Sequence, residues 1–167
     1  MDKPIINIAD VTLDPRPPAM SPKGEAAEKY DAKMGFIGTR IGARKLGYNL
    51  TAVPPGKRAF PLHNHHVNEE MFFILQGSGE LRMGDAVHPI RTGDVIACPA
   101  GGAETAHQII NTGIEELRYL AVSIESNLEM AQYPDSGKFA VKAEFGGGRR
   151  VIVIGRDRDH VDFWEGE

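Results

Sequence analysis

The sequence has one cysteine among its 167 residues, Cys98, which excludes an internal disulfide framework and any cysteine-rich zinc module. It also has no excess of basic residues. Lys and Arg number 19 against 23 Asp and Glu, for a formal net charge of -4, so we expect neither nucleic acid nor an anionic membrane as a partner. No stretch approaches the ~20 consecutive apolar residues of a membrane helix. Prolines and aspartates interrupt the N-terminal stretch, where a signal peptide would need an apolar run. We therefore expect a soluble, cytoplasmic protein.

Long helical patterns are also missing between residues 35 and 124, which argues against alternating strand and helix units. The sequence has instead a series of short apolar runs bounded by glycine and other turn residues. These runs lie at 35–42, 47–56, 70–77, 79–84, 86–93, 94–102, 107–113 and 116–124, with two more at 138–145 and 149–155. Strand-length runs at this regular spacing predict an all-β sandwich or barrel.

The chain reads as one domain, because its apolar content of 41% suffices for one core and no linker divides it. Residues 1–34 are rich in proline and charge and predict an extended N-terminal arm, with room for one short helix within 23–34. Residues 35–125 are predicted to form the barrel. Residues 126–167 are predicted to add C-terminal strands and a tail that pack on the same domain.

Side chains able to bind a metal gather in the segment 63–70, directly before an apolar run. His63 and His65 are two positions apart, so both imidazoles point to the same side of an extended strand. Such a pair can hold a transition metal when further ligands arrive from elsewhere. Each residue taken alone would usually be a solvated surface residue. Their concentration before a buried strand indicates a metal site, because burying unpaired charge is costly.

Two glutamates compete for the acidic ligand position in this segment. If 63–69 were one unbroken strand, Glu69 would share the face of the histidines. If the polar residues 66–69 form a turn, Glu70 begins the next antiparallel strand and its carboxylate can face them. The polar character of residues 67–69 favours the turn, and with it Glu70.

The segment resembles the first motif of the cupin superfamily, in particular small single-domain, metal-binding members of the conserved-barrel type. The motif is a glycine, a His-x-His pair, a glutamate three or four residues later, and a glycine after six more. Gly56, His63 and His65, Glu70 and Gly77 match it, with one extra residue between Gly56 and His63. The spacing to Gly77 identifies Glu70 as the ligand position of the family.

A second cupin motif also has its counterpart. Gly93 is followed by five residues and then by Pro99-Ala100-Gly101, and His107 is followed by three residues and Asn111. The sequence departs from the family between Gly101 and His107, where five residues replace the usual two. The segment 102–106 is therefore expected to form a lengthened loop. Glu104 within it is a candidate substitute ligand or acid/base group.

The resemblance implies a double-stranded β-helix, or jelly-roll barrel, over roughly residues 35–125. It also implies a divalent transition metal, Fe, Mn, Zn, Ni or Cu, held by His63, His65, Glu70 and His107. Members of the superfamily often dimerise, so a homodimer is expected. Phe72 and Ile74 follow Glu70 at strand spacing and are expected to line the apolar wall of a pocket, whereas Cys98 is expected to be a small core residue.

Three functional hypotheses follow, since this fold hosts many unrelated activities. The first is a metal-dependent enzyme acting on a small molecule, by oxygenase (dioxygenase), sugar-phosphate-type isomerase or lyase chemistry. The second is a module that binds or senses a metabolite without converting it. The third is a structural cupin with a passive ion.

Overall fold

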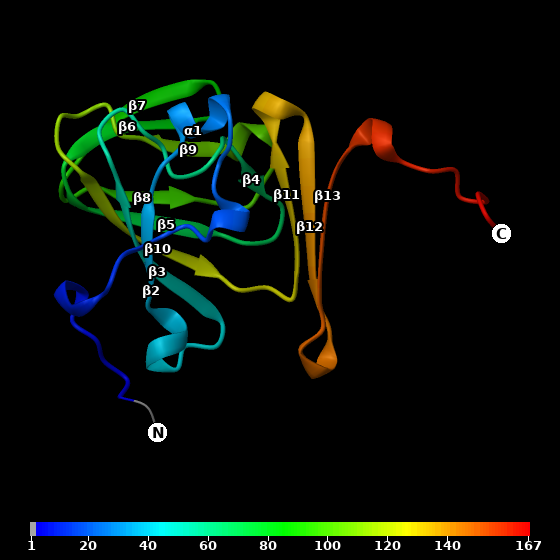
Figure 1. Cartoon of the computed structure of the whole chain (residues 1–167), viewed down its shortest axis with the longest axis horizontal. Coiled ribbons are helices and arrows are strands. Elements are labelled where there is room, and N and C mark those ends of the chain that lie inside the picture. The colour runs from blue at the N-terminus through cyan, green and yellow to red at the C-terminus, as the bar shows by residue number, and fades with distance from the viewer. Residues whose placement is uncertain (1–2) are drawn as a thin grey trace.

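A computed structural model describes residues 3–167, and its regular structure is mostly antiparallel strand (Figure 1). The largest sheet has six strands, in the order β1 (Asp14–Pro15), β2 (Lys33–Phe36), β3 (Leu46–Val53), β10 (Leu117–Ile124), β5 (Glu70–Gln76) and β8 (Val95–Cys98). A three-stranded sheet has the order β7 (Ala86–Arg91), β6 (Ser78–Met83) and β9 (His107–Ile110). A four-stranded sheet has the order β13 (Arg150–Arg156), β12 (Lys138–Glu144), β11 (Leu128–Tyr133) and β4 (Asn64–His65). The chain has the predicted all-β, jelly-roll fold.

The structure differs from the local predictions in one run, shortens one predicted helix and adds one strand. The run 35–42 is strand only to Phe36, and Gly38–Ile41 form a short 3-10 helix, which ends at Gly42 in the left-handed region with φ 84°. The helix expected within 23–34 is reduced to α1 (Glu25–Lys29), which follows Gly24, also at positive φ. Strand β11 was not predicted, because its side chains alternate only weakly in polarity.

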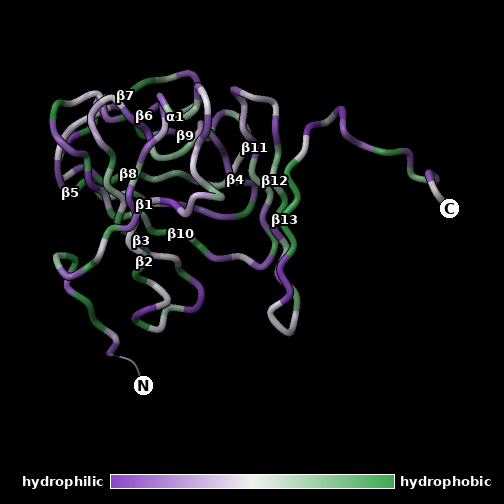
Figure 2. The backbone as a smooth tube through the Cα atoms, viewed as in Figure 1, coloured by the Kyte–Doolittle hydropathy of each residue, from purple (hydrophilic) through white to green (hydrophobic). Residues whose placement is uncertain are grey.

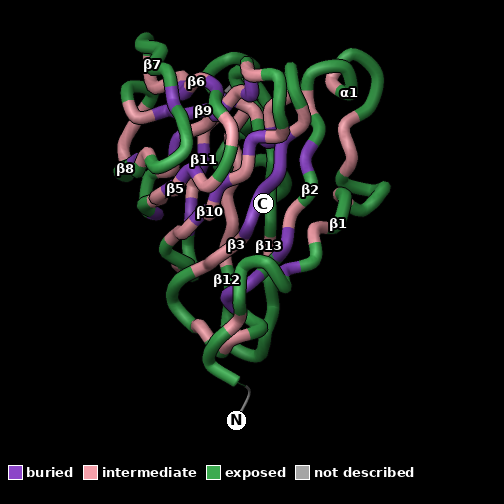
Figure 3. Tube along the Cα trace, turned by 90° about the vertical axis from the view of Figure 1, so that its left-hand side faces the viewer, coloured by how far each residue is buried: buried purple, intermediate pink, exposed green. Residues whose placement is uncertain are grey.

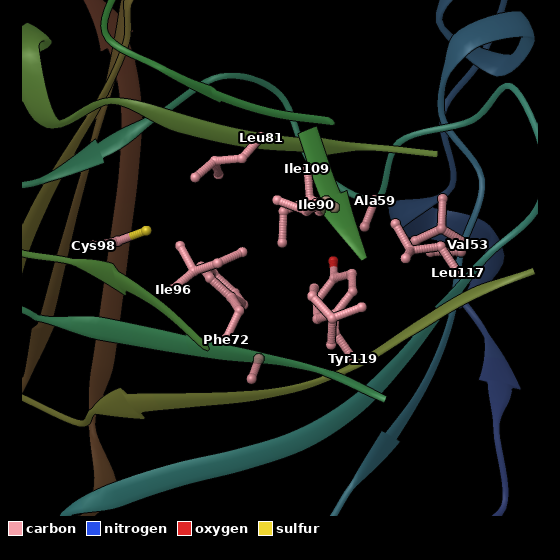
Figure 4. Close-up of a cluster of buried hydrophobic side chains, with 13 residues drawn as sticks. Val53, Ala59, Phe72, Leu81, Ile90, Ile96, Cys98, Ile109, Leu117 and Tyr119 are labelled. Atoms are coloured by element: carbon pink, nitrogen blue, oxygen red, sulfur yellow. The ribbon is translucent and has the colours of Figure 1, made fainter. Parts of the chain in front are cut away.

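The core lies between the sheets, where apolar side chains from several strands meet (Figure 4). Ile74 of β5 and Leu117 and Tyr119 of β10 are among the largest fully buried side chains. Burying a side chain of this size contributes about 1.5–3 kcal/mol to stability. Buried segments follow strands of the barrel in Figure 3, whereas Figure 2 shows apolar segments both there and on the exposed outer strand β13.

The two predicted motifs are tied together by the backbone. His63 and His107 form an isolated antiparallel bridge, in which the His107 N–H donates to the His63 carbonyl at 2.7 Å and the His63 N–H donates to the His107 carbonyl at 3.2 Å. At the far end of β9, the buried Asn111 amide donates to the carbonyls of Val53 and Glu115, both at 2.8 Å. The second motif therefore lies beside the first.

The C-terminal hairpin of β12 and β13 forms the outer part of the fold, and the tail after β13 runs away from the barrel (Figure 1). Strand β13 pairs only with β12 and exposes Ile152, Val153 and Ile154. The expected homodimer stays a prediction. Within residues 3–167, no helix has both the length and the apolar character needed to cross a membrane.

Candidate metal centre

The structure brings His63, His65, Glu70 and His107 together at one end of the barrel. One ligand atom from each of these residues lies within 4.8 Å of the ligand atoms of the other three. The Glu70 Oε2 atom is 2.9 Å from His107 Nε2, 3.5 Å from His65 Nε2 and 4.0 Å from His63 Nε2. Metal–ligand bonds of about 2.0–2.2 Å place donors on opposite sides of an ion a little over 4 Å apart. A small contraction of the cluster would therefore suit one ion.

Each member of the cluster comes from a different part of the fold. His65 lies on β4, Glu70 is the first residue of β5, and His107 is the first residue of β9. His63 precedes β4 and is held beside His107 by the backbone bridge. Residues 66–69 contain no strand, as predicted, and Glu69 is exposed to solvent. However, β4 pairs with β11 and does not form a hairpin with β5.

Hydrogen bonds orient two of the imidazoles for metal binding. The Nδ1 atoms of His63 and His107 lie 2.9 Å from the Pro61 carbonyl and 3.2 Å from the Thr105 carbonyl, so each Nδ1–H donates to a carbonyl oxygen. This tautomer leaves the Nε2 lone pairs aimed at the Glu70 carboxylate. Both ring nitrogens of His65 are buried without a hydrogen-bond partner. The imidazole lone pairs point at a carboxylate, and the buried nitrogens of His65 have no hydrogen-bond partner. A cation bound between these groups would satisfy all of them.

The electrostatics of the cluster favour the metal-binding forms of His63 and Glu70, whereas they favour the protonated form of His65. Burial, reinforced by the charge of His107, lowers the pKa of His63 to about 4, so this imidazole is neutral at pH 7. Burial alone would raise the pKa of Glu70, but the imidazoles of His107 and His65 beside its carboxylate lower it below the usual range. The pKa of His65 is raised, because the carboxylates of Glu70 and Glu129 outweigh the opposing effect of burial.

The cluster forms part of the wall of a cavity of about 290 Å³. The rest of the wall is aromatic or aliphatic with two amides: Phe60, Phe72, Ile109, Tyr119, Ala121 and Tyr133, with Asn49 and Gln108. No Lys or Arg lines it in the part of the chain that the structure describes. Phe72 lies on the wall as predicted, but Ile74 is in the core and does not reach the cavity.

The lengthened loop keeps its acidic residue away from the cluster. Glu104 lies in a 3-10 turn, Ala103–Thr105, where its carboxylate accepts a hydrogen bond from the Gly102 N–H at 2.8 Å. Its side chain is exposed and does not line the cavity. His107 reaches the cluster, because the extra residues turn outward and the chain rejoins the barrel at Ala106, whose carbonyl accepts from the Gly84 N–H at 2.7 Å.

Glu129 on β11 is a site residue that the sequence reasoning missed. Its side chain is buried, and its carboxylate accepts hydrogen bonds from the backbone N–H groups of His66, Val67 and Asn68 at 3.1, 3.3 and 2.6 Å. The same carboxylate lies 3.8 Å from His65 Nδ1. Tyr133, four residues later on the same strand face, lines the cavity. Recognising β11 as a strand would have placed both residues near the histidines.

Cys98 is expected to resist thiol reagents in the folded protein. Its side chain is 1% exposed in the core, and burial, with a smaller effect from Glu70, raises its pKa to about 12. At pH 8 the thiol is therefore protonated as well as covered, and the thiolate is the reactive form. Mass spectrometry after iodoacetamide treatment should show no labelling of the native chain and full labelling in guanidinium chloride. Rapid labelling of the native chain would contradict the buried placement.

The comparisons with known proteins agree with this geometry. The family model described as "Cupin domain" matches residues 49–123. Among curated proteins, the oxalate-binding protein of Thermotoga maritima is 38% identical over 72 residues, covering 43% of this chain and 56% of the relative. The chain spans only 54%, 61% and 56% of the lengths of the three curated relatives that it matches.

Two solved structures extend the likeness. A putative sugar phosphate isomerase from Acidithiobacillus ferrooxidans matches with a TM-score of 0.74 and 26% identity, over 90% of this chain and 92% of that one. A predicted oxalate decarboxylase from Thermotoga maritima matches with a TM-score of 0.58 and 26% identity, over 73% of this chain and 99% of that one. The strand topology, the His/Glu cluster and the matched family model lead to one conclusion: residues 49–123 of this chain are a cupin domain.

Proposed function

We propose that this chain is a metal-dependent enzyme that acts on a small carboxylic acid, by lyase or oxygenase chemistry. The observation that carries the proposal is the convergence of three imidazoles and one carboxylate, within 4.8 Å of one another, on the wall of a cavity. Four protein ligands leave positions open on an octahedral ion. A divalent transition metal bound there would supply Lewis-acid polarisation of a substrate oxygen.

The cavity can accept a small acid whose carboxylate binds the ion. With no Lys or Arg on the described cavity wall, the positive charge that meets a carboxylate there would come from the ion itself. The phenyl ring of Phe72 and the half-buried ring of Tyr133 would exclude water from one side of the substrate. The amides of Asn49 and Gln108 are available to orient its oxygens.

Lyase or oxygenase chemistry is favoured over isomerisation for one reason. Isomerisation of a sugar needs a base that shuttles a proton near the metal. Glu70 is the only carboxylate on the described cavity wall, and it belongs to the metal cluster. Glu104, the candidate base from the sequence, lies outside the cavity. The names of two similar proteins, an oxalate-binding protein and a predicted oxalate decarboxylase, lend support to a small acid.

A second candidate is a module that binds such an acid without converting it. The lack of a free acid or base on the described cavity wall favours this alternative. A measurement of substrate turnover distinguishes the enzyme from the binding module. The metal-loaded chain would be incubated with oxalate, with and without dioxygen, while oxygen uptake and carbon dioxide release are measured. Binding without either signal would favour the module over the enzyme.

The proposed metal site is tested by elemental analysis of chain purified without added metal. We expect near-stoichiometric transition metal in the parent and a marked loss in the His63→Ala and Glu70→Ala variants, because each change removes one of four ligands. Glu69→Ala is the matched control, since it removes an exposed carboxylate next to Glu70. Retention of the parent's metal content by the first two variants would refute the ligand assignment.

A further inference from the structure

A second hollow, of about 490 Å³, opens beside the candidate metal cavity, and Phe60 lines both. We call it the outer groove. One side of it comes from the N-terminal arm and α1, and the other from the turn between β11 and β12. Its wall is mostly apolar, and it carries two cations, Arg16 and Lys138.

Arg16 is held at the junction of the groove and the cavity. Its guanidinium carbon lies 4.8 Å from the centre of the Phe60 ring, and its Nη2 donates to the Ala59 carbonyl. Asp31 lies near enough to raise its pKa, against a larger lowering by burial, but forms no ion pair with it within the described residues. The half-buried guanidinium thus keeps N–H donors without an anionic partner.

Lys138 supplies the second cation. Its ammonium nitrogen lies 5.5 Å from the centre of the Tyr133 ring, and within residues 3–167 it has no carboxylate partner. Asp135 also lines the groove, but both of its oxygens accept hydrogen bonds from Arg82, at 2.7 and 2.9 Å. The charge of Asp135 is therefore balanced by Arg82. Among the described residues, neither Arg16 nor Lys138 forms an ion pair with a carboxylate, although Asp31 lies near Arg16.

Two aromatic rings connect these cations to the cluster. The Phe60 ring centre lies 6.2 Å from that of His63, and the Tyr133 ring centre lies 6.1 Å from it. The Arg16 guanidinium carbon is thus no farther from the His63 ring than the sum of 4.8 and 6.2 Å, about 11 Å. The corresponding bound for Lys138, from 5.5 and 6.1 Å, is under 12 Å. A small extended molecule can span such a distance.

We propose that Arg16 and Lys138 form an anion subsite, and that the substrate has two ends: a carboxylate end at the metal cluster and a carboxylate or phosphate at this subsite. The middle of the molecule would pass beside Phe60 and Tyr133, whose rings contact the two cations and lie near His63. The proposal rests on the proposed function, because the first end needs the metal. The second end is inferred to be anionic because the two cations of the outer groove would attract a negatively charged group.

The test compares three sugar acids that have the same metal-chelating α-hydroxy acid end. Gluconate has a hydroxyl at its far end, 6-phosphogluconate has a phosphate and glucarate has a carboxylate. Calorimetric titration of zinc-loaded chain should give at least about tenfold tighter binding for one or both of the latter two than for gluconate, because a charge-assisted contact contributes at least about 1.4 kcal/mol. The preferred acid identifies the anion.

The variants Arg16→Gln and Lys138→Gln should each reduce this preference, measured as the ratio of the affinity for the second anionic acid to the affinity for gluconate. Arg16→Lys is a second variant, for the case that the N-terminal arm needs a cation at this position in order to fold. It keeps the positive charge and should retain part of the preference. Lys45→Gln is the control, since it removes the same charge at an exposed position outside the groove. Equal affinities for the three acids, or binding of none of them, would overturn the subsite. If the parent chain contains metal in the same experiment, the proposed metal site would still stand. A parent without metal would overturn both proposals.

Discussion

Replacing His107 with alanine is expected to lower the affinity for a divalent transition metal by at least about 100-fold, because residues that only support a ligand already account for 10–100-fold. The result would be informative because five residues, instead of the two typical of the family motif, separate Gly101 from His107. The His107 ring is 3% exposed and its Nε2 is 2.9 Å from the Glu70 carboxylate. The measurement is competition with a chromophoric chelator for zinc.

The matched control for this change is His66→Ala. His66 is an exposed imidazole in the same region, and its Nε2–H donates to Gln132 Oε1 at 2.9 Å instead of facing the cluster. Its removal should leave the metal affinity within about twofold of the parent. Circular dichroism would establish that both variants fold. An unchanged affinity in folded His107→Ala would remove His107 from the ligand set.

Changing Glu129 to glutamine is expected to have two separable effects. The first is a loss of about 1–3 kcal/mol of folding stability, because the amide group of glutamine cannot accept from all three backbone N–H groups that the carboxylate now satisfies. The second is a 10–100-fold loss of zinc affinity, because the negative charge 3.8 Å from His65 Nδ1 helps to orient and polarise that imidazole. Thermal melting of metal-free chain measures the first effect, and chelator competition measures the second.

Two comparisons separate a positioning role for Glu129 from a merely structural one. Glu129→Asp keeps the charge and should recover more of the zinc affinity than of the stability, since its shorter side chain reaches the loop less well. Glu69→Gln removes an exposed carboxylate from the same loop and should change neither quantity. A stability loss in Glu129→Gln with the parent's zinc affinity would limit Glu129 to holding residues 66–68.

Much of the barrel could be predicted because its strands are short apolar runs with turn residues between them. Met83 to Ala86 illustrate this, since the turn between the predicted runs 79–84 and 86–93 joins β6 and β7 at Gly84, where φ is 52°. Residues 38–41 were mispredicted because the short run 35–42, with apolar residues near both ends and polar residues between them, suits a strand and a 3-10 turn equally. Strand β11 was missed because part of its burial depends on its pairing with β4, which is distant in sequence.

The site was predictable to the extent that its ligands are close in sequence. The two-residue spacing of His63 and His65 indicated a shared face, and the rings lie 5.0 Å apart. His107 was placed by resemblance to a family motif, not by local pattern. Glu129 and Tyr133 could not be placed, because both lie on β11. Their position beside the histidines depends on the pairing of β11 with β4, which lies about 65 residues earlier in the sequence. Tertiary pairing of this kind leaves no periodic signal in the segments that it joins.

The candidate ligands belong to three separate sheets: His65 to the four-stranded sheet, Glu70 to the six-stranded sheet and His107 to the three-stranded sheet. An ion coordinated by all three would therefore cross-link the three sheets, in addition to the backbone bridge between His63 and His107. The free energy of coordination would then also be free energy of folding, in proportion to how poorly the unfolded chain binds the same ion. Metal supply would thus govern the lifetime of the folded barrel as well as the chemistry in its cavity.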